Sequence, residues 1–90
     1  MSAPLPLGRI VATAGALKLL SEIGAHPFEY LARHATGDWG ELCALDRRQN
    51  QIALRDGLRV FSSYDVPAGR VWVVTEADRS VTTILLPEEY

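Results

Sequence analysis

The stretch LRVFSSYDVPAGRVWVVTEADRSVTTILL, residues 58–86, decides the fold. In its first part Leu58, Val60, Ser62, Tyr64 and Val66 alternate with Arg59, Phe61, Ser63 and Asp65. This period of two is typical of a strand. The turn residues 67–69 separate it from a second strand at 70–76, and loop 77–80 precedes a third at 81–86. Strands joined by loops this short are antiparallel neighbours, so we expect a three-stranded meander.

Three helices are predicted before this stretch, at residues 14–23, 27–35 and 44–56. Thr13 suits the N-cap of the first helix and Pro27 the first position of the second, and a glycine follows each helix. Each helix carries a single apolar stripe. The expected stripes are Leu17, Leu20 and Ile23; Phe28, Leu31 and Ala35; and Leu45, Ile52 and Ala53.

The order of these elements predicts an α+β fold. Arg9–Thr13 reads as a short additional strand because Ile10 and Val11 are β-branched, and its place in the sheet is left open. Helices with one apolar stripe cover one face of a sheet. We therefore expect an N-terminal strand and about three helices packed on one face of a C-terminal three- to four-stranded antiparallel sheet. Ninety residues leave room for a single domain, residues 1–90.

Composition narrows the classes of function. The net charge is −2 and the densest basic cluster is Arg47 and Arg48, so broad nucleic-acid binding is not expected. Cys43 is the only cysteine, which excludes an intrachain disulfide and a thiolate metal site within one chain, and we expect no metal. Residues 1–7 carry no cationic segment and no apolar run of about 18 residues occurs, so we expect a cytoplasmic protein that does not enter membranes.

Recognisable catalytic motifs are missing from the sequence. It contains no phosphate-binding glycine loop, dinucleotide fingerprint, paired-histidine zinc motif or serine-nucleophile elbow. We therefore expect no cofactor and favour a function other than catalysis.

A first group of candidate site residues lies around the glycine-flanked segment 37–40. His34 and Asp38 are close in sequence, and an acid can orient an imidazole for proton transfer. The alternative is that His34 interacts with the helix C-terminus while Asp38 begins the turn. Trp39 offers a face for stacking on a base, or else fills the core and fixes the loop.

A second group follows the central strand of the meander. Arg79 can hold a phosphate or carboxylate, Glu76 can accept a proton, and Ser80 or Thr82 can donate to an oxyanion. The alternative is structural: Asp78 and Ser80 form the turn, and Arg79 pairs with Glu76. The acidic tail 88–90 either docks on a basic partner or ends in solvent with Tyr90 packed back on the sheet.

Several segments resemble a family of small bacterial proteins often called plasmid-related proteins. These segments are RH at 33–34, GDWG at 37–40, Asp46, Asn50, Gly57, VVTEADRS at 73–80, TT at 82–83 and LPEEY at 86–90. The similarity extends over residues 7–90, and Ala14 departs from the proline expected there. The family has no settled activity. The resemblance implies a setting of plasmids, integrated elements and phages in proteobacteria.

These observations leave three hypotheses. The first is a mobile-element-associated binding protein that acts on a host or element-encoded macromolecule through loops 37–40 and 76–80. The second is a metal-independent ribonuclease-like enzyme, in which His34 or Glu76 transfers protons near a phosphate held by Arg79. The third, compatible with either, is a homodimer that buries a second sheet face carrying Phe61, Trp72 and Val74.

Overall fold

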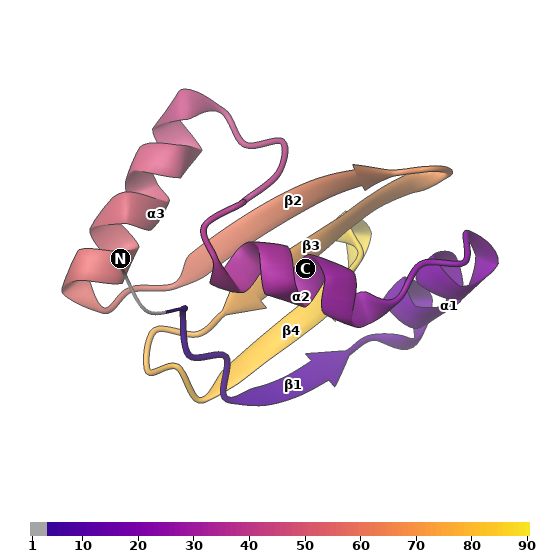
Figure 1. The fold of residues 1–90 in the computed structure, drawn as a ribbon, viewed down its shortest axis with the longest axis horizontal. Coiled ribbons are helices and arrows are strands. Elements are labelled where there is room, and N and C mark those ends of the chain that lie inside the picture. Colours follow the sequence, from indigo (N-terminus) through magenta and orange to yellow (C-terminus); the bar gives the residue numbers. More distant parts are fainter. Residues whose placement is uncertain (1–3) are drawn as a thin grey trace.

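The computed structural model describes residues 4–90 and has the predicted α+β architecture (Figure 1). Three helices and a four-stranded sheet follow the predicted order, with strand ends shifted by one or two residues. The elements are β1 (Arg9–Ala12), α1 (Ala14–Glu22), α2 (Pro27–Ala35), α3 (Ala44–Asp56), β2 (Val60–Val66), β3 (Gly69–Thr75), β4 (Val81–Leu85) and the short 3₁₀ helix η1 (Pro87–Glu89).

The sheet has the strand order β1-β4-β3-β2. Strands β2, β3 and β4 form the expected antiparallel meander, with Ser62 opposite Val73 and Val73 opposite Ile84. Strand β1 takes an edge position and pairs with β4 in parallel, which makes the sheet mixed. A parallel pair needs a long connection, and the three helices and two strands between β1 and β4 provide it.

The two faces of the sheet differ in what lies on them. Helix α1 packs on β4, and α2 packs on β2 and β3, on the same face. This covered face presents Val60, Ser62, Tyr64, Val66, Val71, Val73, Thr75, Thr82 and Ile84. The opposite face, called the open face below, presents Arg9, Val11, Phe61, Ser63, Asp65, Arg70, Trp72, Val74, Val81, Thr83 and Leu85, and of these Ser63, Val74 and Leu85 are buried. Strand alternation thus places Phe61, Trp72 and Val74 together, as predicted.

The helix stripes were predicted correctly in their later members but not in their first. Leu20, Leu31 and Ala53 are buried, whereas the side chains of Leu17, Phe28 and Leu45 are exposed. A helix has 3.6 residues per turn, so the α1 stripe, spaced by three, drifts around the helix and Leu17 leaves the buried face. In α2 and α3 the exposed members, Phe28 and Leu45, lie in the first turn of their helix. In their place Ala16 is buried in α1, Tyr30 and His34 in α2, and Asn50 in α3.

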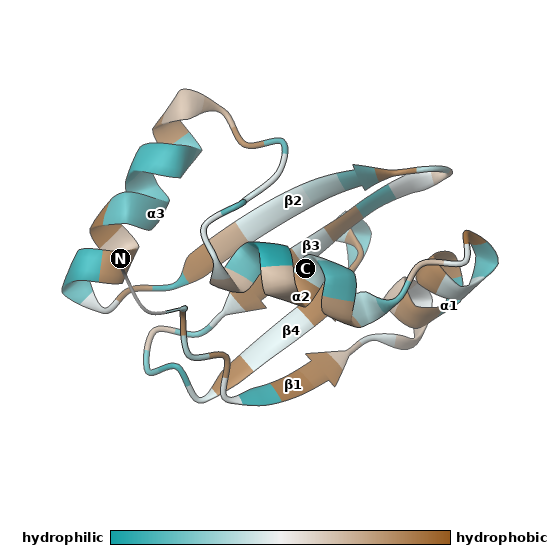
Figure 2. Ribbon diagram, viewed as in Figure 1, coloured by the Kyte–Doolittle hydropathy of each residue, from teal (hydrophilic) through white to brown (hydrophobic). Residues whose placement is uncertain are grey.

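Helix α3 lies beside the β2 edge of the sheet, and Asn50 attaches it there. The Asn50 amide donates to the Phe61 carbonyl over 2.6 Å, and its oxygen accepts from the Phe61 N–H over 3.1 Å. These two bonds satisfy backbone groups that an edge strand otherwise leaves open. Figure 2 shows α3 as largely hydrophilic and β1 as largely hydrophobic. A few specific contacts therefore hold helix α3 against strand β2. Besides the Asn50 hydrogen bonds, they include the packing of Ala53 on Trp39 and Val60.

Candidate functional site

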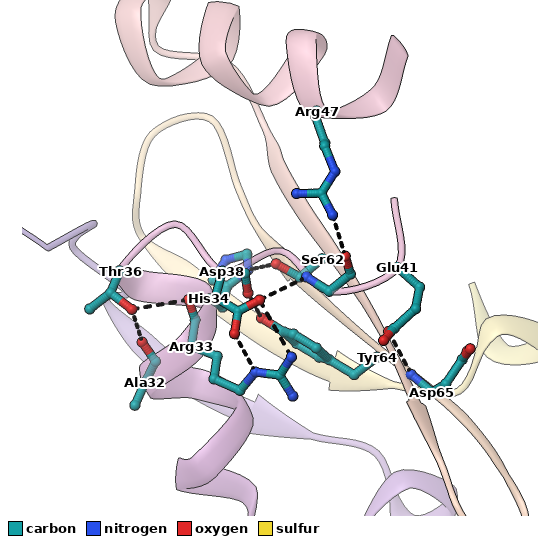
Figure 3. Close-up of polar contacts among 11 residues, drawn as sticks. Ala32, Arg33, His34, Thr36, Asp38, Glu41, Arg47, Ser62, Tyr64 and Asp65 are labelled. Atoms are coloured by element: carbon teal, nitrogen blue, oxygen red, sulfur yellow. Dashed lines mark hydrogen bonds and ion pairs between the residues drawn. The ribbon is translucent and has the colours of Figure 1, made fainter. Parts of the chain in front are cut away.

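The loop Gly37–Gly40 is held rigidly by the elements around it (Figure 3). The Asp38 carboxylate accepts from Arg33 Nε over 2.7 Å, and this hydrogen bond lowers the pKa of Asp38. The Tyr64 hydroxyl donates to the Asp38 carbonyl over 2.6 Å, and Arg47 Nη2 donates to the Gly40 carbonyl over 2.7 Å. The structure thus pairs Asp38 with Arg33 and does not bring its carboxylate to the His34 imidazole.

Gly40 allows the loop to meet the sheet edge. It forms a parallel bridge with Ser63 at a φ of 73°, and a Cβ at this position would clash with the Ser63 carbonyl. Only glycine combines that φ with so close a backbone approach. Trp39, next to it, is buried against Ala53 and Val60, so its ring packs in the core rather than presenting a face to solvent.

His34 lies under the loop, with only 1% of its surface exposed, in a line of buried hydroxyl groups. Its Nδ1 is 2.5 Å from Ser62 Oγ, and its Nε2 is 2.8 Å from Thr75 Oγ1. Thr75 Oγ1 is 2.7 Å from Thr82 Oγ1, which donates to the Leu7 carbonyl over 2.7 Å. Burial, together with the charge of Arg79, lowers the pKa of His34 to about 4, so the imidazole is neutral near pH 7.

The direction of this line of hydrogen bonds determines the tautomer of His34. A carbonyl can only accept, so Thr82 spends its one hydroxyl proton on Leu7. Thr75 must then donate to Thr82, His34 Nε2–H must donate to Thr75, and Ser62 must donate to Nδ1. Both ring nitrogens are therefore occupied within the core, and the imidazole has no position left for a substrate proton.

Around the β3–β4 loop, the side chains of Asp78, Ser80 and Thr82 form hydrogen bonds with other groups of the same chain. Asp78 Oδ1 accepts from the Ser80 N–H over 3.0 Å and from its hydroxyl over 2.5 Å, and these bonds lower the pKa of Asp78. Thr82 is buried in the hydroxyl line. The Glu76 carboxylate lies 3.8 Å from Arg59 Nε and makes no hydrogen bond with His34, whose ring nitrogens contact Ser62 and Thr75.

Arg79 reaches from the same loop to the end of α3. Its Nη1 donates to the carbonyls of Leu58, over 2.6 Å, and Glu76, over 3.1 Å, while Nη2 donates to the Ala53 carbonyl over 3.0 Å. The carbonyls at a helix C-terminus attract a cation. Within residues 4–90 no carboxylate lies within 4.0 Å of this guanidinium. Two of its five N–H donors remain for another acceptor.

Both predicted loops border one groove. Its volume is about 1100 Å³, and its walls are the segment before β1, the C-terminal end of α2 and the C-terminal half of α3. The Leu5 N–H donates to the Ala35 carbonyl over 2.9 Å, which joins the first two walls. Arg79 is the only charged residue among those that line it in the described chain: Pro4, Leu5, Pro6, His34, Ala35, Thr36, Gly37, Trp39, Leu54 and Arg79.

Several residues that shape this region were not predicted as site residues. Ser62 and Thr75 orient His34, Tyr64 fixes the loop, and Leu54 and the segment 4–6 line the groove. Ser62 and Thr75 could have been recognised from the sequence, because they are polar residues at inward positions of strands that otherwise carry apolar residues there. The groove wall at 4–6 depends on how the segment before β1 pairs with the end of α2, for which the sequence has no local signal.

Searches with the chain matched no protein-family model, no curated protein and no solved structure. Among residues 4–90, no helix is long and apolar enough to cross a membrane. In the same range, no group of three or more histidine, cysteine or acidic side chains is placed to bind a metal ion.

Proposed function

We propose that this chain is a non-catalytic binding protein that takes an extended, largely apolar and acidic segment of a host or element-encoded protein into the groove. The observation that carries the proposal is the lining of that groove: mostly apolar side chains, the neutral polar residues His34 and Thr36, exposed backbone at Gly37 and one guanidinium, with no acidic residue among the described lining residues. Concave, mostly apolar sites with few polar groups are the usual form of a ligand site.

The charge of the groove selects the chemistry of the ligand. Arg79 is partly buried and is balanced only by backbone carbonyls, so a carboxylate that reaches its remaining donors would gain a charge-assisted hydrogen bond. The exposed Leu54 and the prolines at 4 and 6 offer apolar contact beside it. A peptide with apolar residues around one acid matches both features.

Proton-transfer chemistry is not part of the proposal. A ribonuclease-like reaction would need His34 or Glu76 beside a phosphate bound to Arg79. Both His34 nitrogens are engaged by hydroxyls, and Glu76 lies next to Arg59. The sequence resemblance implies a mobile-element setting. That setting is compatible with a small protein that acts by binding a segment of another protein.

The experiment is selection of short peptides from a random display library on the immobilised protein, followed by titration of the enriched peptides. Leu54→Glu places a negative charge in the groove, and Leu54→Lys places a positive one there. Leu45 provides the matched control, because it is an exposed leucine on the same helix, 67% against 47% exposed, but does not line the groove. Arg79 is a poorer choice, since its loss would also remove three hydrogen bonds to backbone carbonyls.

We expect enriched peptides to contain an acidic residue among apolar ones. Leu54→Glu should weaken their binding at least about tenfold, equivalent to about 1.4 kcal/mol, and Leu54→Lys should weaken it less. The Leu45→Glu and Leu45→Lys variants should bind as the wild type does. Failure to enrich any peptide, or equal losses at positions 54 and 45, would refute a peptide site in this groove.

A further inference from the structure

The two edges of the sheet differ in how their outward backbone groups are used. At the β2 edge, side chains or loop backbone form hydrogen bonds with the outward groups of Phe61, Ser63 and Asp65. Strand β1 forms the other edge, and Figure 1 shows no further element of the described chain beyond it. An exposed edge of this kind can pair with a strand from another molecule.

The outward backbone groups of β1 belong to Ile10 and Ala12. The N–H groups of Arg9 and Thr13 donate to carbonyls of β4 and of the loop before it, over 2.9 and 3.0 Å. Backbone direction alternates along a strand, so the N–H and carbonyl groups of residues 10 and 12 point away from β4. Within residues 4–90, no group outside the sheet forms a backbone hydrogen bond with either residue.

Strand β1 also lacks most features that protect an edge strand from pairing. It contains no proline, and its register with β4 runs without a bulge. Ile10 and Val11 are 44% and 39% exposed and lie on opposite sides of the sheet. A strand added at this edge would cover both side chains and satisfy the outward backbone groups between them.

Charges at the two ends of β1 favour a second copy as the added strand. Arg9 is exposed and makes no ion pair within residues 4–90. At the other end, Glu89 Oε1 accepts from the Thr13 hydroxyl over 2.6 Å, and Oε2 has no hydrogen-bond partner in the same range. In an antiparallel copy centred on Val11, Arg9 of each chain lies opposite Thr13 of the other and can reach Glu89. The two-fold axis forms this pair twice.

We propose that this chain forms a homodimer in which two β1 strands pair antiparallel about a two-fold axis at Val11. The two four-stranded sheets then become one continuous sheet. In this register Ile10 of each copy exchanges main-chain hydrogen bonds with Ala12 of the other, and the two Val11 side chains meet. Main-chain hydrogen bonds and two ion pairs hold the dimer, independently of the groove, and we expect a dissociation constant below about 1 mM.

Disulfide trapping in a Cys43→Ser background, which removes the exposed native thiol, tests the register. The two Val11 Cα atoms would lie about 4.5 Å apart, within the range of a disulfide, whereas the two Ile10 residues would be diagonal neighbours about 7–8 Å apart. With glutathione disulfide as oxidant, Val11→Cys should form covalent dimer at least about tenfold faster than the similarly exposed Ile10→Cys. Equal rates, or a faster Ile10→Cys, would refute this register.

Sedimentation equilibrium with charge-reversal variants tests the choice of partner. Arg9→Glu should raise the dissociation constant at least about tenfold, because it would meet Glu89 of the other copy. Arg48→Glu, the same change at an exposed arginine of α3, should leave it within about twofold of the wild type. Combining Arg9→Glu with Glu89→Arg restores opposite charges and should bring the dissociation constant back to within about threefold of the wild type.

Two results in sedimentation would overturn the proposal. One is a wild type that stays monomeric up to about 1 mM, and the other is a folded double variant that dimerises no better than Arg9→Glu. If circular dichroism shows that the double variant is unfolded, Ile10→Pro replaces it, because proline there removes an outward N–H and no hydrogen bond to β4. A folded Ile10→Pro variant that dimerises like the wild type then contradicts pairing through β1.

Discussion

The two faces of the sheet use different means to bury polar and aromatic groups. On the covered face Tyr64, His34 and three hydroxyl side chains are enclosed by helices, and each polar atom of this set has a hydrogen-bond partner. On the open face the aromatic rings lie in an edge-to-face row, and the cross-strand neighbours Ser63 and Trp72 each keep a buried polar atom without a partner. The comparison indicates that hydrogen bonds fix the polar side chains of the covered face, whereas on the open face, where Val74 and Leu85 are also buried, Ser63 and Trp72 are held without them.

The largest expected effect separates the two faces by their aromatic residues. Tyr64 is buried, donates to the Asp38 carbonyl and lies under the Arg33 guanidinium, 4.5 Å from its ring centroid, and burial raises its pKa to about 12. Tyr64→Ala should lower the free energy of unfolding by about 3–5 kcal/mol. Phe61→Ala, on the open face, should cost about 1–2 kcal/mol, because its ring is only partly buried.

Urea denaturation at a low protein concentration measures both variants without the contribution of any dimer. Tyr64→Phe, which keeps the ring and removes the hydroxyl, should lose about 1 kcal/mol. Equal losses for Tyr64→Ala and Phe61→Ala would show that the open face is as important to the monomer as the covered one.

The second effect is a dependence of stability on pH that originates from the covered face. The pKa of His34 is about 4 in the folded protein and about 6.5 in the unfolded chain, so the unfolded chain binds the proton first as pH falls. Stability should therefore decrease as pH falls below about 6.5 and reach a loss of about 3 kcal/mol near pH 4. The lowered pKa of Asp38, which accepts from Arg33, adds a further loss only below this window.

Unfolding curves between pH 7 and pH 4 measure this dependence. His34→Gln keeps a polar side chain that cannot be protonated. The variant should be less stable than the wild type at pH 7, but its free energy of unfolding should fall much less between pH 6.5 and pH 4. A His34→Gln variant with the same pH dependence as the wild type would assign that decrease to other groups.

Much of the fold was predictable, whereas the contacts of the candidate residues were not. The alternation around Tyr64 and the turn after Val66 are local signals, and they identified the meander and the residues on each face. The parallel pairing of β1 with β4 joins segments about 70 residues apart, and a four-residue strand carries too little pattern to select its neighbour. The partners of His34 were missed for a similar reason, because Ser62 and Thr75 lie 28 and 41 residues away.

The smallest effect compares two adjacent serines on β2 that point to opposite faces. Ser62 donates to His34 Nδ1 over 2.5 Å, whereas the buried Ser63 Oγ has no hydrogen-bond partner in the described structure. Ser62→Ala should cost about 1–3 kcal/mol, since it leaves a buried ring nitrogen unpaired, and Ser63→Ala should change stability by less than about 0.5 kcal/mol in either direction. Both substitutions remove the same oxygen from the same strand, so backbone propensity and lost volume cancel in the comparison. Denaturation at pH 7 measures the difference, and a larger loss for Ser63→Ala would mean that polar contacts on the open face, not those around His34, stabilise this part of the sheet.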